Sequence, residues 1–157
     1  MPQITALIHT HNHARCIGRA LESLWPCDQF VVVDHGATDG TAQIARQYGA
    51  LIARVEDALR QIRHDWVLLL KPSEALSEAL ESTLYQWKQE DRGRAAAAFA
   101  VRIREETPAG WETQPSETRL LHRSLLEKHG SGASIFSAEG GPAKPLLEGD
   151  LLRFRNS

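Results

Sequence analysis

Short apolar runs alternate with amphipathic stretches over the first 90 residues of the chain. Four of the runs have little polar relief, which is typical of parallel strands that are buried on both faces. These predicted strands are residues 3–8, 29–33, 50–55 and 66–70. Between them, apolar side chains recur at the three- and four-residue spacings of a helix face. The predicted helices are residues 14–24, 38–48, 56–64 and 77–89.

This alternation predicts an α/β fold, a Rossmann-like and mostly parallel sheet with helices on both faces. Right-handed crossovers bring the carboxyl ends of the strands to one edge of the sheet, where open α/β sheets bind their ligands. We therefore expect three loops to form a working edge. They are residues 9–13, 34–40 and 71–74.

The pattern changes beyond residue 90. An alternating stretch predicts a strand at residues 96–104, a shorter strand is expected at 117–122, and a last edge strand at 151–154. Gly, Ser, Ala and Pro are concentrated at residues 130–145, which we interpret as loops. The second part of the chain is therefore expected to be loop-rich.

Composition narrows the class of protein. A length of 157 residues predicts one domain, and 42% hydrophobic with 24% charged residues is typical of a globular protein. The 18 Lys and Arg against 20 Asp and Glu argue against nucleic-acid binding by bulk charge. No apolar run approaches the roughly 20 residues of a membrane-spanning helix, and no signal peptide is visible. Cys16 and Cys27 lack metal-ligand spacing, so we expect free thiols in a cytoplasmic protein.

Residues 31–41 read V-V-V-D-H-G-A-T-D-G-T and place Asp34 at the end of a buried strand. This segment resembles the V-V-D-x-S-x-D-G-T signature of family 2 glycosyltransferases, which have the GT-A fold. Other segments resemble that family in the same order, and the match covers residues 4–123. They are T-H-N-H at 10–13 with the helix that follows, the helix and strand at 42–53, D-W-V-L-L-L-K-P-S-E-A-L-S-E-A-L at 65–80, and R-L-L-H-R at 119–123. The last of these resembles a strand of the lipopolysaccharide-core sugar transferases.

The resemblance implies that the chain binds a nucleotide-sugar donor, such as a UDP-sugar, and a saccharide or lipid-linked acceptor in cell-envelope polysaccharide synthesis. It implies that residues 1–90 form the nucleotide-binding half and residues 91–157 a reduced, truncated acceptor half. The general base that such a transfer needs comes late in the chain, where Glu139, Glu148 and Asp150 are available, and Glu139 is our candidate. The candidate donor-binding residues are Thr10, Asn12, Asp34, Asp39, Lys71 and Ser73. For Asp39, a structural role at the start of a helix is the simpler interpretation.

One departure from the family bears on the mechanism. The D-x-D motif, which holds a divalent metal on the donor diphosphate, is replaced by K-P-S at residues 71–73. Mg²⁺ and Mn²⁺ prefer carboxylate oxygens, so their use is doubtful and we assign no metal ligand. The next residue, Glu74, is expected to be peripheral.

Three interpretations of this departure stay open. In the one we favour, the protein is a degenerate transferase that has lost its chemistry and keeps a nucleotide site. In the second, Lys71 neutralises the diphosphate directly as a point charge, without metal. In the third, another set of carboxylates such as Asp34, Asp39 and Glu74 holds the metal.

Other polar residues have simpler interpretations. His9, His11 and His13 alternate and share one face of an extended chain, yet a polar loop is a better interpretation than a metal site. Arg119 and Arg123 are expected on a solvated face of a strand rather than at a diphosphate.

Two functions remain. One is a nucleotide-sugar-dependent glycosyltransferase, and the other is a catalytically inactive nucleotide- or partner-binding module of the same fold. A flavodoxin-like receiver domain is disfavoured, because receivers need an acidic pair after the first strand and this strand ends in H-T-H-N-H.

Overall fold

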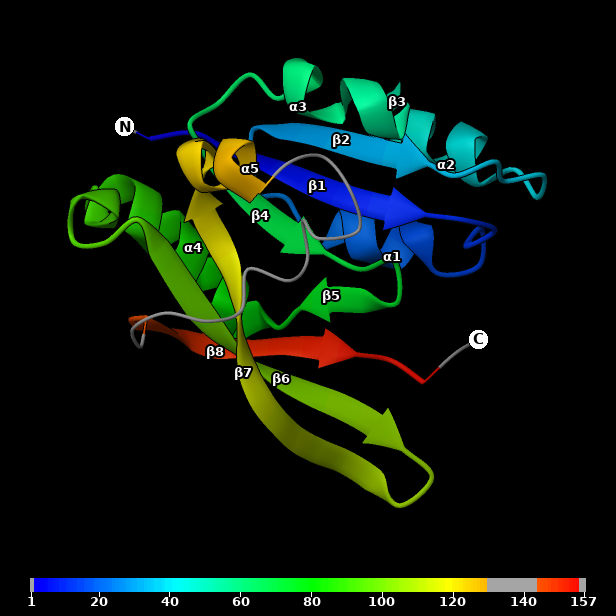
Figure 1. Cartoon of the computed structure of the whole chain (residues 1–157). Helices are drawn as coiled ribbons and strands as arrows, with labels where there is room; N and C mark the ends of the chain where they lie inside the picture. The colour runs from blue at the N-terminus through cyan, green and yellow to red at the C-terminus, as the bar shows by residue number, and fades with distance from the viewer. Residues whose placement is uncertain (1, 130–143, 156–157) are drawn as a thin grey trace.

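The computed structural model describes residues 2–129 and 144–155, which contain one eight-stranded sheet in the order β3-β2-β1-β4-β7-β6-β8-β5 (Figure 1). The strands are β1 Ile4–Thr10, β2 Gln29–Asp34, β3 Leu51–Ala53, β4 Trp66–Leu70, β5 Glu74–Leu76, β6 Ala98–Thr107, β7 Gly110–His122 and β8 Leu146–Arg153. The helices are α1 Ile17–Glu22, α2 Thr41–Gln47, α3 Ala58–Gln61, α4 Glu78–Gln89 and α5 Arg123–His129, with 3-10 turns η1 Val55–Asp57 and η2 Arg92–Arg94.

The first half of the chain forms the predicted parallel sheet. β1 pairs in parallel with β2 and with β4, and β2 pairs in parallel with β3. Leu7 of β1 lies between Val31 and Leu69, and all three side chains are fully buried. The arrowheads of β1, β2 and β4 point the same way in Figure 1, so their carboxyl ends share one edge of the sheet.

The second half extends the same sheet. β7 is antiparallel to β4 and to β6, and β8 is parallel to β6. It follows that β6 and β8 run in the same direction as β4. Thr107 and Arg153, which end β6 and β8, therefore lie at the same edge as Thr10 and Asp34, which end β1 and β2. This carboxyl edge carries Thr10, Asp34 and Lys71, three of the predicted ligand-binding residues.

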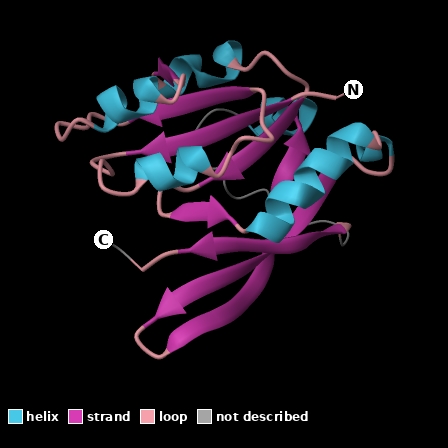
Figure 2. Ribbon diagram, turned by 180° about the vertical axis from the view of Figure 1, so that it is seen from behind, coloured by secondary structure: helices cyan, strands magenta, loops and turns pink. Residues whose placement is uncertain are grey.

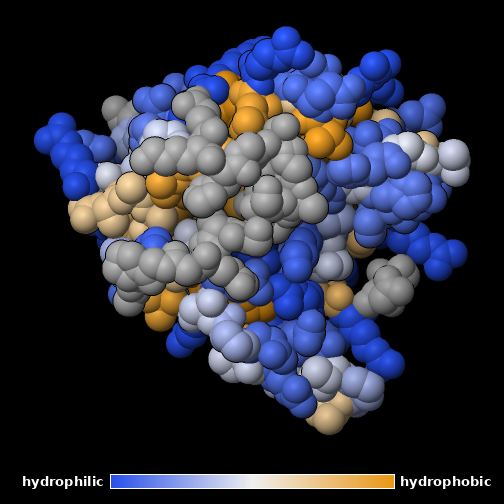
Figure 3. Space-filling model, in the orientation of Figure 1, coloured by the Kyte–Doolittle hydropathy of each residue, from blue (hydrophilic) through white to orange (hydrophobic). Residues whose placement is uncertain are grey.

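Helices cover both faces of the sheet, as predicted. α1, α2 and α4 contribute to one apolar cluster, where Trp87 of α4 is fully buried, and Figure 2 shows this helical face. α3 and α5 contribute Ala58 and Leu126 to a second cluster on the other face. The outer end of the β6–β7 hairpin extends beyond both clusters, and its surface is mostly hydrophilic in Figure 3.

The structure departs from the sequence prediction in the second half. The strand predicted at 151–154 overlaps the end of β8, but β8 lies between β6 and β5, so its prediction as an edge strand is wrong. Glu74 was expected in a loop but begins β5, whose pairing partner β8 is distant in the sequence. β7 is much longer than the predicted 117–122, because its outer part is polar and pairs with β6 outside the core. Most of the Gly/Pro-rich stretch at 130–145 lies outside the described residues.

Within the part of the chain that the structure describes, no helix is both long and apolar enough to cross a membrane. Cys16 and Cys27 are buried free thiols, as expected.

Gly149 allows β8 to pack closely against the start of α4. Its φ is +103°, and a Cβ there would lie 2.5 Å from the backbone nitrogen of Leu80. We expect Gly149→Ala to destabilise the protein by about 3 kcal/mol, because positive-φ strain and overpacking add. Gly49→Ala is the matched control, with φ +82° and open space around it, and should lose only about 1 kcal/mol. Urea unfolding measures both variants, and equal losses would contradict the close approach.

Candidate functional site

The ends of β1, β2 and β4 bring the predicted ligand-binding residues to one edge. Thr10 is in register with Asp34, and Ile8 is in register with Leu70, which is followed by Lys71. The carboxyl ends of parallel strands are the usual binding crevice of such a sheet. The loops that carry Asn12 and Asp39 leave from the same edge. The sequence therefore predicted the placement of these residues, while their roles stay predictions.

Asp39 joins the loop after β1 to the start of α2. Its Oδ2 accepts a hydrogen bond of 3.0 Å from the backbone N–H of Ala14, and its Oδ1 accepts bonds from the N–H and hydroxyl of Thr41. These bonds, that of the Thr41 hydroxyl foremost, lower the pKa of Asp39. The arrangement fits the expected role at the start of a helix.

Asn12 and Asp34 also make contacts within the loops. Asn12 has a φ of 53°, and its side-chain oxygen accepts a hydrogen bond of 2.8 Å from the backbone N–H of Thr38. Asp34 Oδ1 accepts a hydrogen bond of 2.9 Å from the N–H of Ala37. Each of the two side chains thus orders the loop after β2. A ligand at this edge would meet a loop whose backbone is already held.

The histidines at this edge pair with one another. His9 Nδ1 and His35 Nε2 lie 2.9 Å apart, so whichever ring carries the proton donates to the other, and the rings stack with centroids 5.2 Å apart. Burial, and then the charge of His35, lowers the pKa of His9 to about 4. His13 Nδ1 lies 2.9 Å from Thr10 Oγ1. The contact between His9 and His35 joins the ends of β1 and β2, and the contact between Thr10 and His13 orders the loop after β1.

The K-P-S turn, residues 71–73, follows β4 and is closed by Glu74. Glu74 Oε1 accepts a hydrogen bond of 2.8 Å from the backbone N–H of Lys71, and the backbone N–H of Glu74 donates to the Lys71 carbonyl at 2.9 Å. Lys71 is exposed, Pro72 is buried and Ser73 is half-buried. The lysine ammonium is thus carried on an ordered turn at the carboxyl edge.

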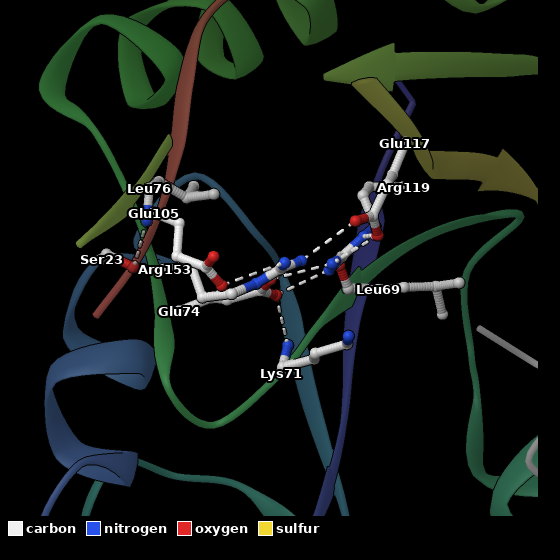
Figure 4. A network of polar contacts seen from close by, with 9 residues as sticks. All are labelled: Ser23, Leu69, Lys71, Glu74, Leu76, Glu105, Glu117, Arg119 and Arg153. Carbon is white, nitrogen blue, oxygen red and sulfur yellow. Dashed lines mark hydrogen bonds and ion pairs between the residues drawn. The ribbon is translucent and has the colours of Figure 1, made fainter. Parts of the chain in front are cut away.

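Glu74 is fully buried, and two arginines bind its carboxylate (Figure 4). Arg119 Nη1 and Nη2 donate to its two oxygens at 2.7 and 2.9 Å, and Arg153 Nε donates to Oε2 at 3.0 Å. Arg119 is itself 1% exposed and donates a further bond to the Leu69 carbonyl at the end of β4. A bidentate, fully desolvated pair of this kind has both charge and geometry satisfied.

A second carboxylate, Glu117, completes the network. Arg119 Nε donates to its Oε1 and Arg153 Nη2 donates to its Oε2, both at 3.0 Å. Burial alone would raise the pKa of Glu117, but the two guanidiniums outweigh burial and the pKa is lowered. Burial would likewise lower the pKa of Arg153, but Glu117 and Glu74 raise it. The network joins β5, β7 and β8 at the carboxyl edge.

These contacts correct three expectations. Arg119 does not lie on a solvated face, and Glu74 is not peripheral. The alternative metal set of Asp34, Asp39 and Glu74 is also wrong. The Glu74 carboxylate already binds two guanidiniums. Among the described residues, no group of three His, Cys, Asp or Glu side chains could hold a metal ion. The sequence signal for the burial of Arg119 is its position directly before two leucines, which are both buried. The strand that carries them, β7, has a neighbouring strand on each side. Arg123 was also expected on a strand, but it begins α5, is half-buried and donates to the Ile62 carbonyl at 3.0 Å.

A cleft of about 420 Å³ lies at the carboxyl edge beside the K-P-S turn. Ser73 and His13 line one side, and Glu105, Arg153 and Phe154 come from the ends of β6 and β8. No residue was predicted here from the sequence except Ser73. Glu139, the predicted general base, lies outside the described residues.

Removing the Glu74 charge should be costly. Glu74→Gln leaves Arg119 buried without its main counter-charge, and we expect a loss of about 3 kcal/mol in the free energy of unfolding. Asp57→Asn is the control, because it breaks an ion pair to Arg60 whose side chain is 76% exposed and should cost less than about 1 kcal/mol. Urea unfolding of both variants tests this, and similar small losses would show that the buried network contributes little.

The His9 pKa predicts a stability change with pH. Between about pH 6.5, its ordinary pKa, and pH 4, the unfolded chain binds a proton at His9 that the folded chain does not. Stability should therefore fall as the pH falls through this window. An NMR titration should place the His9 midpoint near 4, and His9→Gln should weaken the loss of stability. A midpoint near 6.5 would contradict the buried, neutral imidazole.

No family model matches the chain. It is 28% identical over 95 residues to the lipopolysaccharide core biosynthesis glycosyltransferase LpsC of Rhizobium meliloti (strain 1021), a match that covers 52% of this chain and 35% of LpsC.

Two solved structures share the fold. S. aureus TarS 1–349 in complex with UDP-GlcNAc matches with a TM-score of 0.74 and 14% identity over 99% of this chain and 59% of TarS. Glucosyl-3-phosphoglycerate synthase of Mycobacterium tuberculosis, in complex with Mn²⁺, UDP and glucosyl-3-phosphoglycerate, matches with a TM-score of 0.54 and 17% identity over 66% of this chain and 44% of the synthase.

The chain thus spans about a third of LpsC and less than two thirds of either solved structure. The expected fold class is confirmed, and so is the resemblance that carried it. The chain has the GT-A fold of nucleotide-sugar glycosyltransferases and resembles the lipopolysaccharide-core sugar transferases.

Proposed function

We propose that the carboxyl edge of β1, β2 and β4 binds the nucleotide diphosphate of a UDP-sugar. We propose further that the chain acts as a glycosyltransferase in cell-envelope polysaccharide synthesis. The observation that carries this proposal is the convergence of Thr10, Asp34 and the K-P-S turn on one edge of a GT-A sheet. The match to LpsC and the UDP-GlcNAc complex of TarS support the choice of ligand. A cytoplasmic location belongs to the same proposal, since both cysteines are free thiols.

Each predicted residue has a role in this proposal. Asp34 ends β2 and accepts hydrogen bonds from the nucleoside, while Thr10 and Asn12 line the same edge. Lys71 is exposed on an ordered turn, so its ammonium can neutralise the diphosphate as a point charge. Ser73 supplies a hydroxyl donor beside it. Asp39 orders the loop that surrounds the site.

A divalent metal does not fit the residues at the K-P-S turn. The turn offers an ammonium, a proline and a hydroxyl where Mg²⁺ or Mn²⁺ requires carboxylates, and the adjacent Glu74 carboxylate is already bound by Arg119 and Arg153. Lys71 would repel a cation at this position. We therefore assign the charge neutralisation to Lys71 and derive no step through a metal.

Transfer would proceed by attack of an acceptor hydroxyl on the anomeric carbon of the donor. The bond from that carbon to the diphosphate breaks, and the hydroxyl proton passes to a general base. Lys71 would stabilise the charge that develops on the leaving diphosphate. Glu139 remains our prediction for the base.

The second candidate function is a module that binds the nucleotide without transferring the sugar. The replacement of both D-x-D carboxylates by Lys71 and Ser73 favours it. Release of UDP from UDP-sugars, measured with and without saccharide acceptors, separates the two functions. Binding of UDP-sugar with no release would leave only the module.

Nucleotide binding provides the direct test. We expect calorimetry to detect UDP binding of equal affinity with and without Mn²⁺. Lys71→Ala should weaken binding by about tenfold or more, since loss of a charge-assisted contact costs about 1.5–3 kcal/mol. Arg46→Ala, which removes an exposed charge from the last turn of α2, is the control and should bind UDP normally.

The outcomes against the proposal are distinct. If neither UDP, UDP-glucose nor GDP binds, the nucleotide site is wrong. If binding appears only with Mn²⁺, the assignment of the diphosphate to Lys71 is wrong and a metal must be held in another way.

A further inference from the structure

The cleft beside the K-P-S turn has ordered walls. The backbone N–H of Phe154 donates to the Ser73 carbonyl at 2.9 Å, which ties the end of β8 to the turn. The backbone N–H of Arg155 donates to Glu106 Oε1 at 3.1 Å, which ties the same segment to the end of β6. Since β6 and β8 end at the carboxyl edge, the cleft lies on the same edge as the proposed donor site, and Ser73 belongs to both.

The charges in the cleft balance. Glu105, Glu106, Arg153 and Arg155 line it, two acids against two bases. Arg153 is fully engaged, because its Nε donates to Glu74, its Nη2 donates to Glu117 and its Nη1 lies 3.6 Å from Glu105. A phosphate or carboxylate on a ligand would have to compete with these carboxylates for the guanidinium. With Arg153 engaged, the carboxylates of Glu105 and Glu106 stand against one guanidinium, that of the exposed Arg155, so the cleft disfavours an anionic ligand.

The polar groups in the cleft suit a sugar. Carboxylates such as Glu105, whose side chain is 37% exposed, accept hydrogen bonds from hydroxyl groups. Thr107 and His13 add further polar groups, and Pro108 adds an apolar surface. The volume of about 420 Å³ falls in the range of about 300–1,000 Å³ that small-molecule sites occupy. Figure 4 shows that Glu105 and Arg153 approach each other next to the buried network that closes the turn.

We propose that this cleft binds a neutral sugar ring, held by the carboxylates of Glu105 and Glu106, and that this ring is the acceptor of the proposed transfer. The second part rests on the proposed function. A sugar in the cleft lies next to Ser73 and therefore next to the donor diphosphate. The acceptor class is an uncharged saccharide end rather than a phosphorylated sugar.

Amide chemical shifts of the labelled full chain provide the test. The probes are the methyl glycosides of glucose, galactose and mannose, with glucose 6-phosphate as the charged comparison, each without and with saturating UDP. We expect at least one neutral glycoside to shift the amides of Glu105, Glu106, Thr107 and Phe154. Glucose 6-phosphate should bind more weakly than methyl glucoside.

Variants assign the contacts. Glu105→Gln and Glu106→Gln should each weaken glycoside binding by about tenfold, the loss expected for one charge-assisted hydrogen bond. Glu112→Gln is the matched control, because Glu112 is an exposed glutamate of β7 that does not line the cleft, and it should bind normally. Well-dispersed spectra of each variant show that it is folded.

The titrations separate this inference from the proposed function. UDP shifts at Thr10 and Asp34 with no glycoside shifts in the cleft would overturn the sugar site alone. Tighter binding of glucose 6-phosphate would overturn the neutral acceptor. Glycoside shifts without any UDP shifts would keep the sugar site and overturn the donor site, and the absence of both would overturn both proposals.

Discussion

The carboxylate of Glu74 is the point on which the carboxyl edge depends. It is fully removed from water, and its charge is balanced by Arg119 and Arg153, which come from strands distant in the sequence. A buried ion pair is not in itself strong evidence of stability, because the cost of desolvation offsets the attraction. Here the ion pair serves to fix the positions of the segments that it joins. The same carboxylate accepts the backbone N–H of Lys71, so one charged group fixes the turn after β4 and the pairing around it.

The network also explains how β5 can exist as a strand of only three residues. On one side it pairs with β8, and on the other the backbone N–H of Leu76 donates to the hydroxyl of Ser23 at 3.0 Å, just after α1. The hydroxyl in turn donates to the Ala20 carbonyl. Glu74 supplies the remaining anchor. The K-P-S turn is therefore held at both ends, which suits a segment that has to present a lysine and a serine to a ligand.

The sequence predicted the first half of this fold well and the second half poorly, and the reason is physical. β1, β2 and β4 are buried on both faces, so their apolar runs are visible without knowledge of their partners. β5 and the polar outer part of β7 form only because distant strands pair with them, and no local pattern reports that.

The candidate site divides in the same way. Thr10, Asp34 and Lys71 follow apolar strands and could be placed at the carboxyl edge from the sequence alone. The burial of Glu74 could not, because a charged side chain on a strand is ordinarily solvated unless a partner arrives, and for Arg119 the sequence offers only the two leucines that follow it. The cleft could not be predicted from the sequence for a related reason, because Glu105 and Arg153 belong to strands whose parallel pairing is non-local.

The position of β8 between β6 and β5 sets the order in which the molecule can be completed. During synthesis, Glu74 and Arg119 emerge well before Arg153, which is 79 residues beyond Glu74. Until β8 inserts, β5 lacks its pairing partner and the Glu74 carboxylate lacks one of its two arginines. Non-local pairing of this kind is intrinsically slow, because loop closure comes before the contacts that reward it. The turn that carries Lys71 therefore takes its final shape only after β8 has been added, so a chain that stops before β8 cannot acquire the finished site.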